Sequence, residues 1–286
     1  MNQKLNFGFE PLDNRGQWEF SMIDKNSKSF QAAQIIWTCW INGETIKNLP
    51  DSLRPETREQ GYAIQAHFEQ FSEHPLFGWK IAATSSSGQN HIRVSGPMAG
   101  RLFQERVFQP GAELKFGANR MAVAEPEFAF RMGKTLQPRD NVYSQEEVIS
   151  AVNTLHPAIE IPDSRFQDFA DVGEANLIAD NACAHEFIFG PPMPDCWRAM
   201  DLRKHSVKIS VLHGPAHHGQ GSDVLGGPGL ALTWLVNELS KNGLSLNAGS
   251  TVTTGTCAQP ISIKSGDIVR ADYGVLGELT LRFAGQ

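Results

Sequence analysis

The sequence lacks the features that mark several common protein classes. Its four cysteines form no C-x-x-C pair, so neither a zinc ribbon nor a disulfide framework is indicated, and we expect reduced thiols. No apolar run is long enough to cross a bilayer, and the polar N-terminus has no signal-peptide core. We therefore expect a cytoplasmic protein with no membrane partner.

Positive charge is also scarce. The 25 lysines and arginines are outnumbered by 31 aspartates and glutamates, and the net charge of −6 argues against a nucleic-acid partner. Gly219-Gln220-Gly221 has no third glycine at the spacing of a dinucleotide-binding turn. The composition, with 41% hydrophobic and 20% charged residues, is typical of an ordinary globular protein with a substantial core.

Helix patterns cluster in the first third of the chain. One begins near Lys28 and ends before Gly43, and a second opens at Thr57. The fold class predicted is α+β, with a few helices packed on a curved, β-rich sheet or roll. We divide the chain into an N-terminal extension over residues 1–27, a small helical unit over 28–85 and a β-rich domain over 86–286.

Three further segments carry local predictions. Residues 86–100 contain glycine, serine and proline and predict a loop. Residues 157–162 predict a short buried strand, and residues 178–185 predict the start of a buried helix. Within that helix we expect Cys183 to be a small core residue and His185 to be a packed or surface histidine.

The central feature is the stretch 123–130, which predicts a buried strand interrupted by two carboxylates. Glu125 and Glu127 are two residues apart, so their side chains point to the same face of a strand. Two carboxylates in apolar surroundings repel each other and resist ionisation. A hard divalent cation between them is the simplest complement, because such ions prefer oxygen ligands. Pro126 removes one backbone donor, which predicts a sheet edge or a bulge.

Two more charged residues interrupt apolar strands. Glu160 is either paired with Arg165 or a third ligand of the same ion. The second interpretation is favoured, because three carboxylates inside short apolar strands are unusual. Lys80 lies in the apolar stretch 78–85. It is either a lysine whose ammonium reaches solvent at the strand end, or a cation that faces an anionic substrate or transfers a proton.

Several ordered motifs resemble the fumarylacetoacetate hydrolase superfamily. They are Glu125-x-Glu127, the segment from Ile159 to Arg165, Ala179-Asp180-Asn181-Ala182, Thr253-Thr254-Gly255-Thr256 and Gly266-Asp267. The similarity runs from about residue 28 to the end of the chain. Within the superfamily, the chain most resembles the branch of 2-keto-4-pentenoate hydratases and 4-oxalocrotonate decarboxylases.

The resemblance implies a site and a fold. Mg²⁺ or Mn²⁺ would be held by Glu125, Glu127 and Glu160 in a mixed β-roll, which makes residues 86–286 the catalytic domain. The substrate implied is a 2-oxo acid that chelates the metal through its carboxylate and 2-oxo oxygens. A homo-oligomer is expected, and so is a complex with another enzyme of the pathway. Lys80 matches the family lysine, and substrate contacts are implied for Asn181, Cys183, Thr254, Thr256 and Arg165.

Two positions depart from the family pattern. Related enzymes often have Pro-Asp-Tyr-Gly where this chain has Pro97-Met98-Ala99-Gly100, so the aspartate that would donate a proton is absent. Cys183 occupies a position that is often serine. Lys80, acting directly or through a water, is therefore our first candidate for proton transfer.

These features predict a metal-dependent hydratase of aromatic catabolism, which adds water to a 2-hydroxy-2,4-dienoate and gives a 4-hydroxy-2-oxo acid. Three alternatives stay open. A decarboxylase of a 4-oxalocrotonate-like diacid would need a second cation, for which Arg101 and Arg165 are candidates. A hydrolase of acylpyruvates would need a His–Glu pair near the metal, which nothing before Glu125 clearly supplies. A catalytically silent subunit would bind metal and a partner enzyme without turnover.

Overall fold

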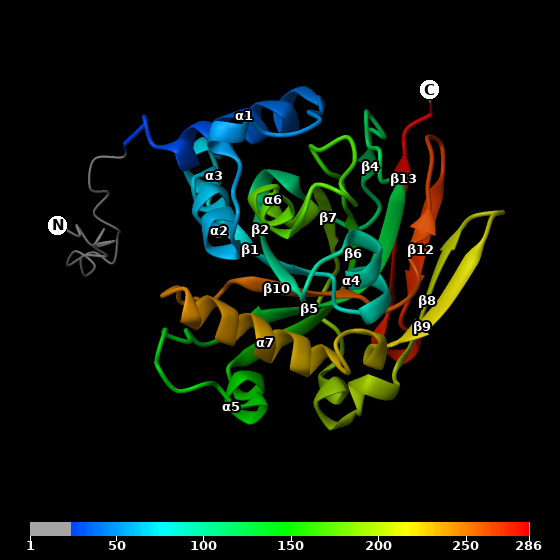
Figure 1. Ribbon diagram of the computed structural model, residues 1–286. Coiled ribbons are helices and arrows are strands. Elements are labelled where there is room, and N and C mark those ends of the chain that lie inside the picture. Colours follow the sequence, from blue (N-terminus) through cyan, green and yellow to red (C-terminus); the bar gives the residue numbers. More distant parts are fainter. Residues whose placement is uncertain (1–23, 286) are drawn as a thin grey trace.

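Two β-sheets form the framework of the computed structural model, which describes residues 24–285 (Figure 1). Of the predicted extension over residues 1–27, residues 1–23 lie outside the described residues. Within the described range, the first sheet has eight strands: β2 (Met98–Phe103), β1 (Leu76–Ala82), β10 (Thr251–Thr256), β5 (Val123–Met132), β6 (Val152–Ile161), β7 (Glu186–Phe189) and β3 (Val107–Phe108) in spatial order, with β11 (Ile261–Ser262) also paired to β5. The second has five: β4 (Glu113–Leu114), β13 (Glu278–Phe283), β12 (Ile268–Asp272), β8 (Ser206–Val211) and β9 (Ala216–Gln220).

The longest strands, β5 and β6, form an antiparallel pair at the centre of the first sheet. Their side chains Phe128 and Ile159 are fully buried, and burial of such a side chain stabilises a fold by about 1.5–3 kcal/mol. Tyr273, which follows β12, joins the two sheets. Its buried hydroxyl lies 2.7 Å from the carbonyl oxygen of Glu127 on β5 and 2.9 Å from that of Ala158 on β6. The strands that carry the candidate ligands are therefore held from both sheets.

Helices pack around this framework, and the sheets and helices together confirm the predicted α+β class (Figure 1). The described α-helices are α1 (Lys28–Asn42), α2 (Arg58–Ala66), α3 (Phe68–Phe71), α4 (Ser86–Ile92), α5 (Gln145–Ser150), α6 (Glu174–Ala179) and α7 (Pro228–Lys241). Ser27 and Thr57 cap α1 and α2, and Gly43 ends α1 with a φ of 66°, which confirms both predicted helices. β1 belongs to the range assigned to the helical unit, yet it pairs with β2 and β10 in the large sheet. The division of the chain at residue 85 stays a prediction.

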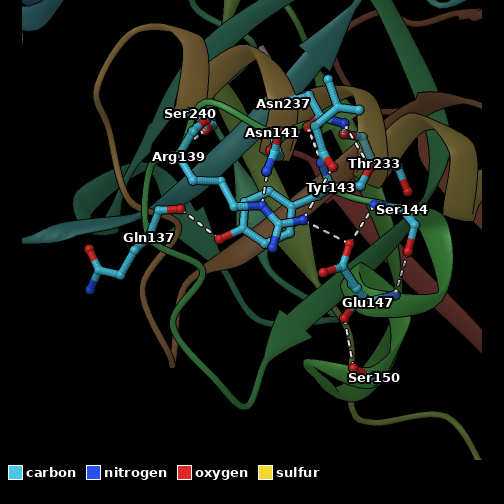
Figure 2. Close-up of polar contacts among 11 residues, drawn as sticks. Gln137, Arg139, Asn141, Tyr143, Ser144, Glu147, Ser150, Thr233, Asn237 and Ser240 are labelled. Atoms are coloured by element: carbon cyan, nitrogen blue, oxygen red, sulfur yellow. Dashed lines mark hydrogen bonds and ion pairs between the residues drawn. The ribbon is translucent and has the colours of Figure 1, made fainter.

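A loop before α5 is fastened to α7 by a polar network (Figure 2). The backbone N–H of Tyr143 donates to the side-chain oxygen of Asn237, and the Asn237 amide donates back to the Tyr143 carbonyl. The Arg139 guanidinium lies 3.6 Å from the centre of the Tyr143 ring and pairs with Glu147 at 2.8 Å. This network orders the surface around α7 without using any of the predicted site residues.

The structure differs from two of the local predictions. Residues 86–100 are not a loop, because Ser85 caps α4 and β2 begins at Met98. The polar sequence of α4 has no hydrophobic stripe from which a helix could be read. Residues 178–185 end a helix rather than start one, since α6 stops at Ala179 and a left-handed turn follows. The strand predicted over 157–162 is the second half of the longer β6.

Pro126 does not lie at a sheet edge. β5 has β6 on one side and both β10 and β11 on the other, so the prediction of an edge is wrong. The alternative prediction is a bulge at Pro126, but Pro126 pairs in regular register with Ile159, and the nearby register shift lies in β10, between Thr253 and Thr256. Gly255 lies in that shift with a φ of 95°, a conformation that favours glycine.

Candidate metal and substrate site

Three glutamates meet on the two central strands. Glu125 of β5 lies directly opposite Glu160 of β6, and Glu127 follows two residues later on the same face of β5. One carboxylate oxygen from each lies within 4.8 Å of the other two. Like charges placed directly opposite each other weaken strand pairing. The structure thus confirms that these side chains converge, and their convergence is stable only if positive charge or protons compensate it.

Three of the four carboxylate oxygens of Glu127 and Glu160 have no hydrogen-bond partner among residues 24–285. These are Oε1 of Glu127 and both oxygens of Glu160, all fully buried. The other oxygen of Glu127 is held, because the Thr253 hydroxyl and the Gly255 backbone N–H both donate to it. A carboxylate fixed through one oxygen presents the other in a defined direction. Buried polar atoms without partners are rare in folded proteins, so these oxygens call for a ligand.

Lys80 is the cation inside the cluster. Its buried ammonium lies 3.0 Å from Oε1 of Glu160, without the angle of a hydrogen bond, and donates to the carbonyl oxygen of Ala182 at 2.9 Å. The lysine therefore does not reach solvent at the strand end. Glu160 pairs with Lys80 rather than with Arg165, so the structure contradicts that alternative. Gly100, opposite Lys80 on β2, leaves the space for this side chain, since a Cβ there would lie 3.0 Å from the lysine stem.

The electrostatics favour protonated or metal-bound carboxylates. Burial, followed by repulsion from Glu160, raises the pKa of Glu125 to about 7, and the same two causes raise the pKa of Glu127 well above its usual value. Burial alone would lower the pKa of Lys80, but the three carboxylates outweigh it and the pKa is raised. One ammonium cannot neutralise three carboxylates. Oxygen ligands, excess negative charge and unsatisfied acceptors together fit a hard divalent cation.

A left-handed turn brings the next part of the site into place. Asn181, Ala182 and Cys183 have φ values of 56°, 51° and 60°, which non-glycine residues rarely adopt. The turn directs the Ala182 carbonyl at Lys80 and brings Cys183 to the pocket wall. Backbone strain of this kind persists only where the surroundings enforce it.

Two predicted substrate contacts instead support this turn. Asn181 exchanges hydrogen bonds with the backbone of Arg101 on β2, through both its oxygen and its amide nitrogen. Arg165 is buried, pairs with Asp180, and donates to the carbonyl of Ala184 just after the turn. Neither Asn181 nor Arg165 lines the pocket. Their contacts make them positioning residues.

A pocket of about 730 Å³ opens beside the glutamates. Of the sequence-predicted residues, Lys80, Glu125, Cys183 and Thr256 line it. Thr254 does not, because its hydroxyl is buried and donates to the carbonyl of Phe128. Glu127 and Glu160 lie beneath the lining, within ligand distance of Glu125.

Sequence reasoning missed several residues of the site. Thr253 and Gly255 position Glu127, although both belong to a motif that the sequence had already singled out. Thr84 and Asp223 line the pocket from segments with no charge pattern of their own. Strand periodicity could have found Thr253, because it alternates with Thr254, whose side chain points into the core. No local signal marks Asp223.

The sulfur and imidazole near the turn are not reactive groups. Burial raises the pKa of the Cys183 thiol to about 12, so it stays a neutral thiol. Burial lowers the pKa of His185 to about 3, and its Nδ1 accepts a hydrogen bond from the Trp40 indole. The prediction of a packed histidine is confirmed, and Cys183 is buried apart from the surface that it presents to the pocket.

Comparison with known proteins gives a consistent set of similarities. Residues 62–284 match the family model described as Fumarylacetoacetate (FAA) hydrolase C-terminal. The 2-hydroxyhexa-2,4-dienoate hydratase of Comamonas testosteroni is 30% identical over 267 residues, which cover 92% of this chain and 99% of that protein. The 2-keto-4-pentenoate hydratase of Paraburkholderia xenovorans (strain LB400) is 27% identical, over 88% of this chain and 94% of that protein.

Solved structures share the fold. The 4-oxalocrotonate decarboxylase from Pseudomonas putida G7, complexed with magnesium and adipate, superposes with a TM-score of 0.81 at 23% identity, over 90% of this chain and 97% of that one. The fumarylpyruvate hydrolase from Pseudomonas aeruginosa, in complex with Mn²⁺ and pyruvate, gives a TM-score of 0.57 at 13% identity, over 75% of this chain and 93% of that one. No helix within residues 24–285 combines the length and apolar character needed to span a bilayer.

Proposed function

Because this chain belongs to the fumarylacetoacetate hydrolase family, we propose that it is a metal-dependent lyase that adds water to a 2-hydroxy-2,4-dienoate and yields a 4-hydroxy-2-oxo acid. One observation carries the proposal. Three carboxylates converge beside a buried lysine at the base of a pocket, and two of them, Glu127 and Glu160, are fully buried with unpartnered oxygens. The similarity to hydratases over most of the chain supplies the reaction class.

The metal in this proposal is Mg²⁺ or Mn²⁺, held by Glu125, Glu127 and Glu160. When bound, the ion supplies a Lewis acid for the carboxylate and 2-oxo oxygens of the substrate and stabilises an enolate. The chain supplies the rigid frame, because Thr253 and Gly255 hold one oxygen of Glu127 and leave the other free.

Lys80 carries out two tasks in the proposed reaction. Its raised pKa keeps the ammonium protonated at neutral pH, so it acts as an acid rather than as a free base. The positive charge complements the substrate carboxylate, and Nζ holds the proton that is delivered, directly or through a water, to C5 of the dienoate. The 2-hydroxyl gives up its proton in the same step, which restores the ammonium and leaves a 2-oxo-3-enoate. Water then adds across C3 and C4, with its hydroxyl on C4 and its proton on C3. A positioned acid of this kind contributes roughly 10²–10⁴ in rate.

The decarboxylase alternative loses its proposed carboxylate-binding residues. Arg101 is buried beside Trp79 and donates to Gln65 and Glu69, and Arg165 pairs with Asp180. Neither arginine lines the pocket, so neither is placed to bind the distal carboxylate of a diacid. This observation favours the hydratase over the decarboxylase.

The hydrolase alternative lacks a placed base. Within the described pocket lining, the histidine is His91, which is exposed on α4 next to Phe169. A water-activating His–Glu pair beside the three glutamates is not formed by His91.

An assay of the purified chain tests the proposal. Protein stripped with a chelator and reloaded with Mg²⁺ is given 2-hydroxypenta-2,4-dienoate, a 4-oxalocrotonate-like diacid and an acylpyruvate in parallel. We expect loss of the dienoate absorbance, dependent on Mg²⁺ and without release of CO₂. Release of CO₂ from the diacid would replace the hydratase by the decarboxylase, and absence of turnover with Mg²⁺ bound would favour the silent subunit.

Assembly and location complete the proposal. We infer a homo-oligomer, and a complex with an enzyme of the same pathway, supported by the β8–β9 hairpin that projects from the molecule with β9 at the sheet end (Figure 1). A cytoplasmic location is supported by four free cysteines.

A further inference from the structure

The pocket changes from polar to apolar with distance from the glutamates. On β5, Val123 precedes Glu125 by two residues and so lies on the same face, and Met121 follows farther along the same wall. On β1, Ala82 follows Lys80 by the same spacing, and buried Met98 is its direct neighbour on β2. Two parts of the pocket, on β1–β2 and on β5 with β10 between them, therefore run from charged groups at the base to hydrocarbon and thioether groups beyond them.

Elements above the strands continue this apolar surface. Ile92 at the end of α4 and Phe169 line the pocket, and both pack on the cluster that contains Met98. Polar residues also line the pocket: Thr84, Thr256 and Gln259 are neutral, and Asp223 is an acid. A carboxylate placed beside Ile92 and Phe169 would lie against hydrocarbon, the neutral polar residues would not cancel its charge, and Asp223 would repel it.

Cations are scarce in the described lining. Lys80 is engaged with Glu160 and with the Ala182 carbonyl. Arg120 is the other lysine or arginine of the lining, and it is exposed. An exposed ion pair is screened by water and contributes little to binding. Arg120 therefore does not supply a buried site for a second carboxylate.

The pocket is larger than the shortest dienoate requires. A five-carbon dienoate with its three oxygens has eight non-hydrogen atoms and occupies at most roughly 240 Å³, even if each atom took the volume of about 30 Å³ that a whole water molecule has in the liquid. The pocket volume of about 730 Å³ leaves more than half of the space beyond the substrate, open mouth included. This remaining space is bordered by the apolar walls.

We propose that the outer half of the pocket is a subsite for an apolar substituent, so that the substrate is a monocarboxylate dienoate with an alkyl or aryl group on C5 and not a diacid. The inference rests on the proposed function, because the metal end of the pocket sets the orientation of the substrate. It extends that function by naming a substrate class, because an apolar substituent would contact the apolar lining residues Met98, Met121, Val123, Ile92 and Phe169.

Binding of two unreactive acids of equal length tests the subsite without turnover. 2-Oxohexanoate and 2-oxoadipate differ only in a terminal methyl or carboxylate, and their affinities for the Mg²⁺-loaded chain are measured by calorimetry. We expect 2-oxohexanoate to bind at least about tenfold more tightly, because the second carboxylate of 2-oxoadipate would be buried without a partner. Equal or tighter binding of 2-oxoadipate would overturn the subsite.

A matched pair of variants locates the preference. Met121→Lys places a cation in the apolar wall, so it should weaken the binding of 2-oxohexanoate and strengthen that of 2-oxoadipate. The ratio of the two affinities should therefore fall. Met121→Leu keeps an apolar side chain and should leave this ratio unchanged. An unchanged ratio in Met121→Lys would overturn the assignment of this wall. Arg120→Ala should leave the ratio within about twofold, as expected for an exposed charge; a selective loss of 2-oxoadipate binding would assign a carboxylate site to Arg120 instead.

Turnover separates the subsite from the reaction. If the hydratase proposal holds, 2-hydroxyhexa-2,4-dienoate should be converted with a higher kcat/KM than 2-hydroxypenta-2,4-dienoate, by about tenfold or more for the added methyl group. If no dienoate is hydrated while 2-oxohexanoate still binds preferentially, the proposed reaction is wrong and the apolar subsite stands. If neither 2-oxo acid binds in the presence of Mg²⁺, both proposals are overturned.

Discussion

Two groups of charged residues in this protein behave oppositely in the structure. Around Arg139, the side chain of Glu147 accepts from the arginine and from the backbone N–H of Ser144 (Figure 2). The hydrogen bond from Arg139, then that from Ser144, lowers the pKa of Glu147 to about 2. In the glutamate cluster, burial and mutual repulsion instead raise the pKa values of Glu125 and Glu127.

The comparison separates a structural network from a binding site. Both regions border a cavity: the glutamates adjoin the pocket of about 730 Å³, and Arg139 borders a cavity of about 660 Å³ beside α7. The Arg139 network is nevertheless complete, because its acid has partners and water solvates the remainder. The glutamate cluster keeps buried oxygens without partners and therefore gains most from a cation. Buried carboxylate oxygens without hydrogen-bond partners identify the site better than its charge or the cavity beside it.

Replacing one buried ligand should give the largest effect. Glu127→Gln should reduce Mg²⁺-dependent turnover by at least about 10²-fold, the loss that a changed partner of a metal ligand already causes. In the metal-free state the same variant should unfold at a higher temperature, because one repelling carboxylate is gone. Steady-state kinetics and calorimetric melting measure the two effects.

Glu147→Gln is the matched control for this change. It removes a carboxylate from the exposed network and should leave turnover unchanged, with a small decrease in Tm. Wild-type turnover in Glu127→Gln would remove the metal-site proposal.

Removing the buried cation should separate catalysis from metal binding. Lys80→Ala should lower kcat/KM by about 10²–10⁴, the contribution of a positioned acid, and change Mg²⁺ affinity far less. Lys208→Ala, at an exposed lysine of β8, should change neither quantity. Equal losses of rate and affinity in Lys80→Ala would mean that the lysine only supports the metal site.

Breaking a buried but fully satisfied pair should affect stability more than chemistry. Arg165→Met leaves Asp180 buried without its cation and should lower the free energy of unfolding by about 3–5 kcal/mol. Arg139→Met removes an exposed cation and should have a much smaller effect. Urea unfolding compares the two variants, and equal losses would contradict the assigned support role of Arg165.

The pH dependence should reveal the cluster in the absence of metal. Between about pH 4.5 and 7 the folded chain binds more protons at Glu125 than the unfolded chain does, so stability falls as the pH rises through that window. Burial also raises the pKa of Glu186 to about 7, with the same sign. Saturating Mg²⁺ should remove the pH dependence of stability that Glu125 causes and leave the pH dependence that Glu186 causes.

The affinity for Mg²⁺ gives the complementary measurement. It should rise with pH below pH 7, by up to about tenfold per pH unit for each proton that must leave Glu125 and Glu127. Titrations at several pH values measure this slope, and an affinity independent of pH in this window would contradict the raised pKa.

Local patterns were sufficient for the elements with strong signals. The helix starts near Lys28 and at Thr57 and the alternation around Glu125 and Glu127 follow from neighbouring residues, and the structure confirms them. The α4 helix and the left-handed turn after Asp180 were missed, because a short polar helix has no periodicity and three consecutive non-glycine left-handed residues have no sequence signature.

The sequence alone determined the identity of the chemistry: three carboxylates and a lysine inside apolar strands, in a chain of the fumarylacetoacetate hydrolase type. Only the tertiary structure decided which residues share the site. In the structure Glu160 pairs with Lys80 and not with Arg165. Asn181, Thr254 and Arg165 lie outside the pocket lining, and apolar residues from distant segments form the apolar wall. The physical reason is that side-chain direction within one strand follows from spacing, whereas contacts between strands depend on register and on the packing of distant segments.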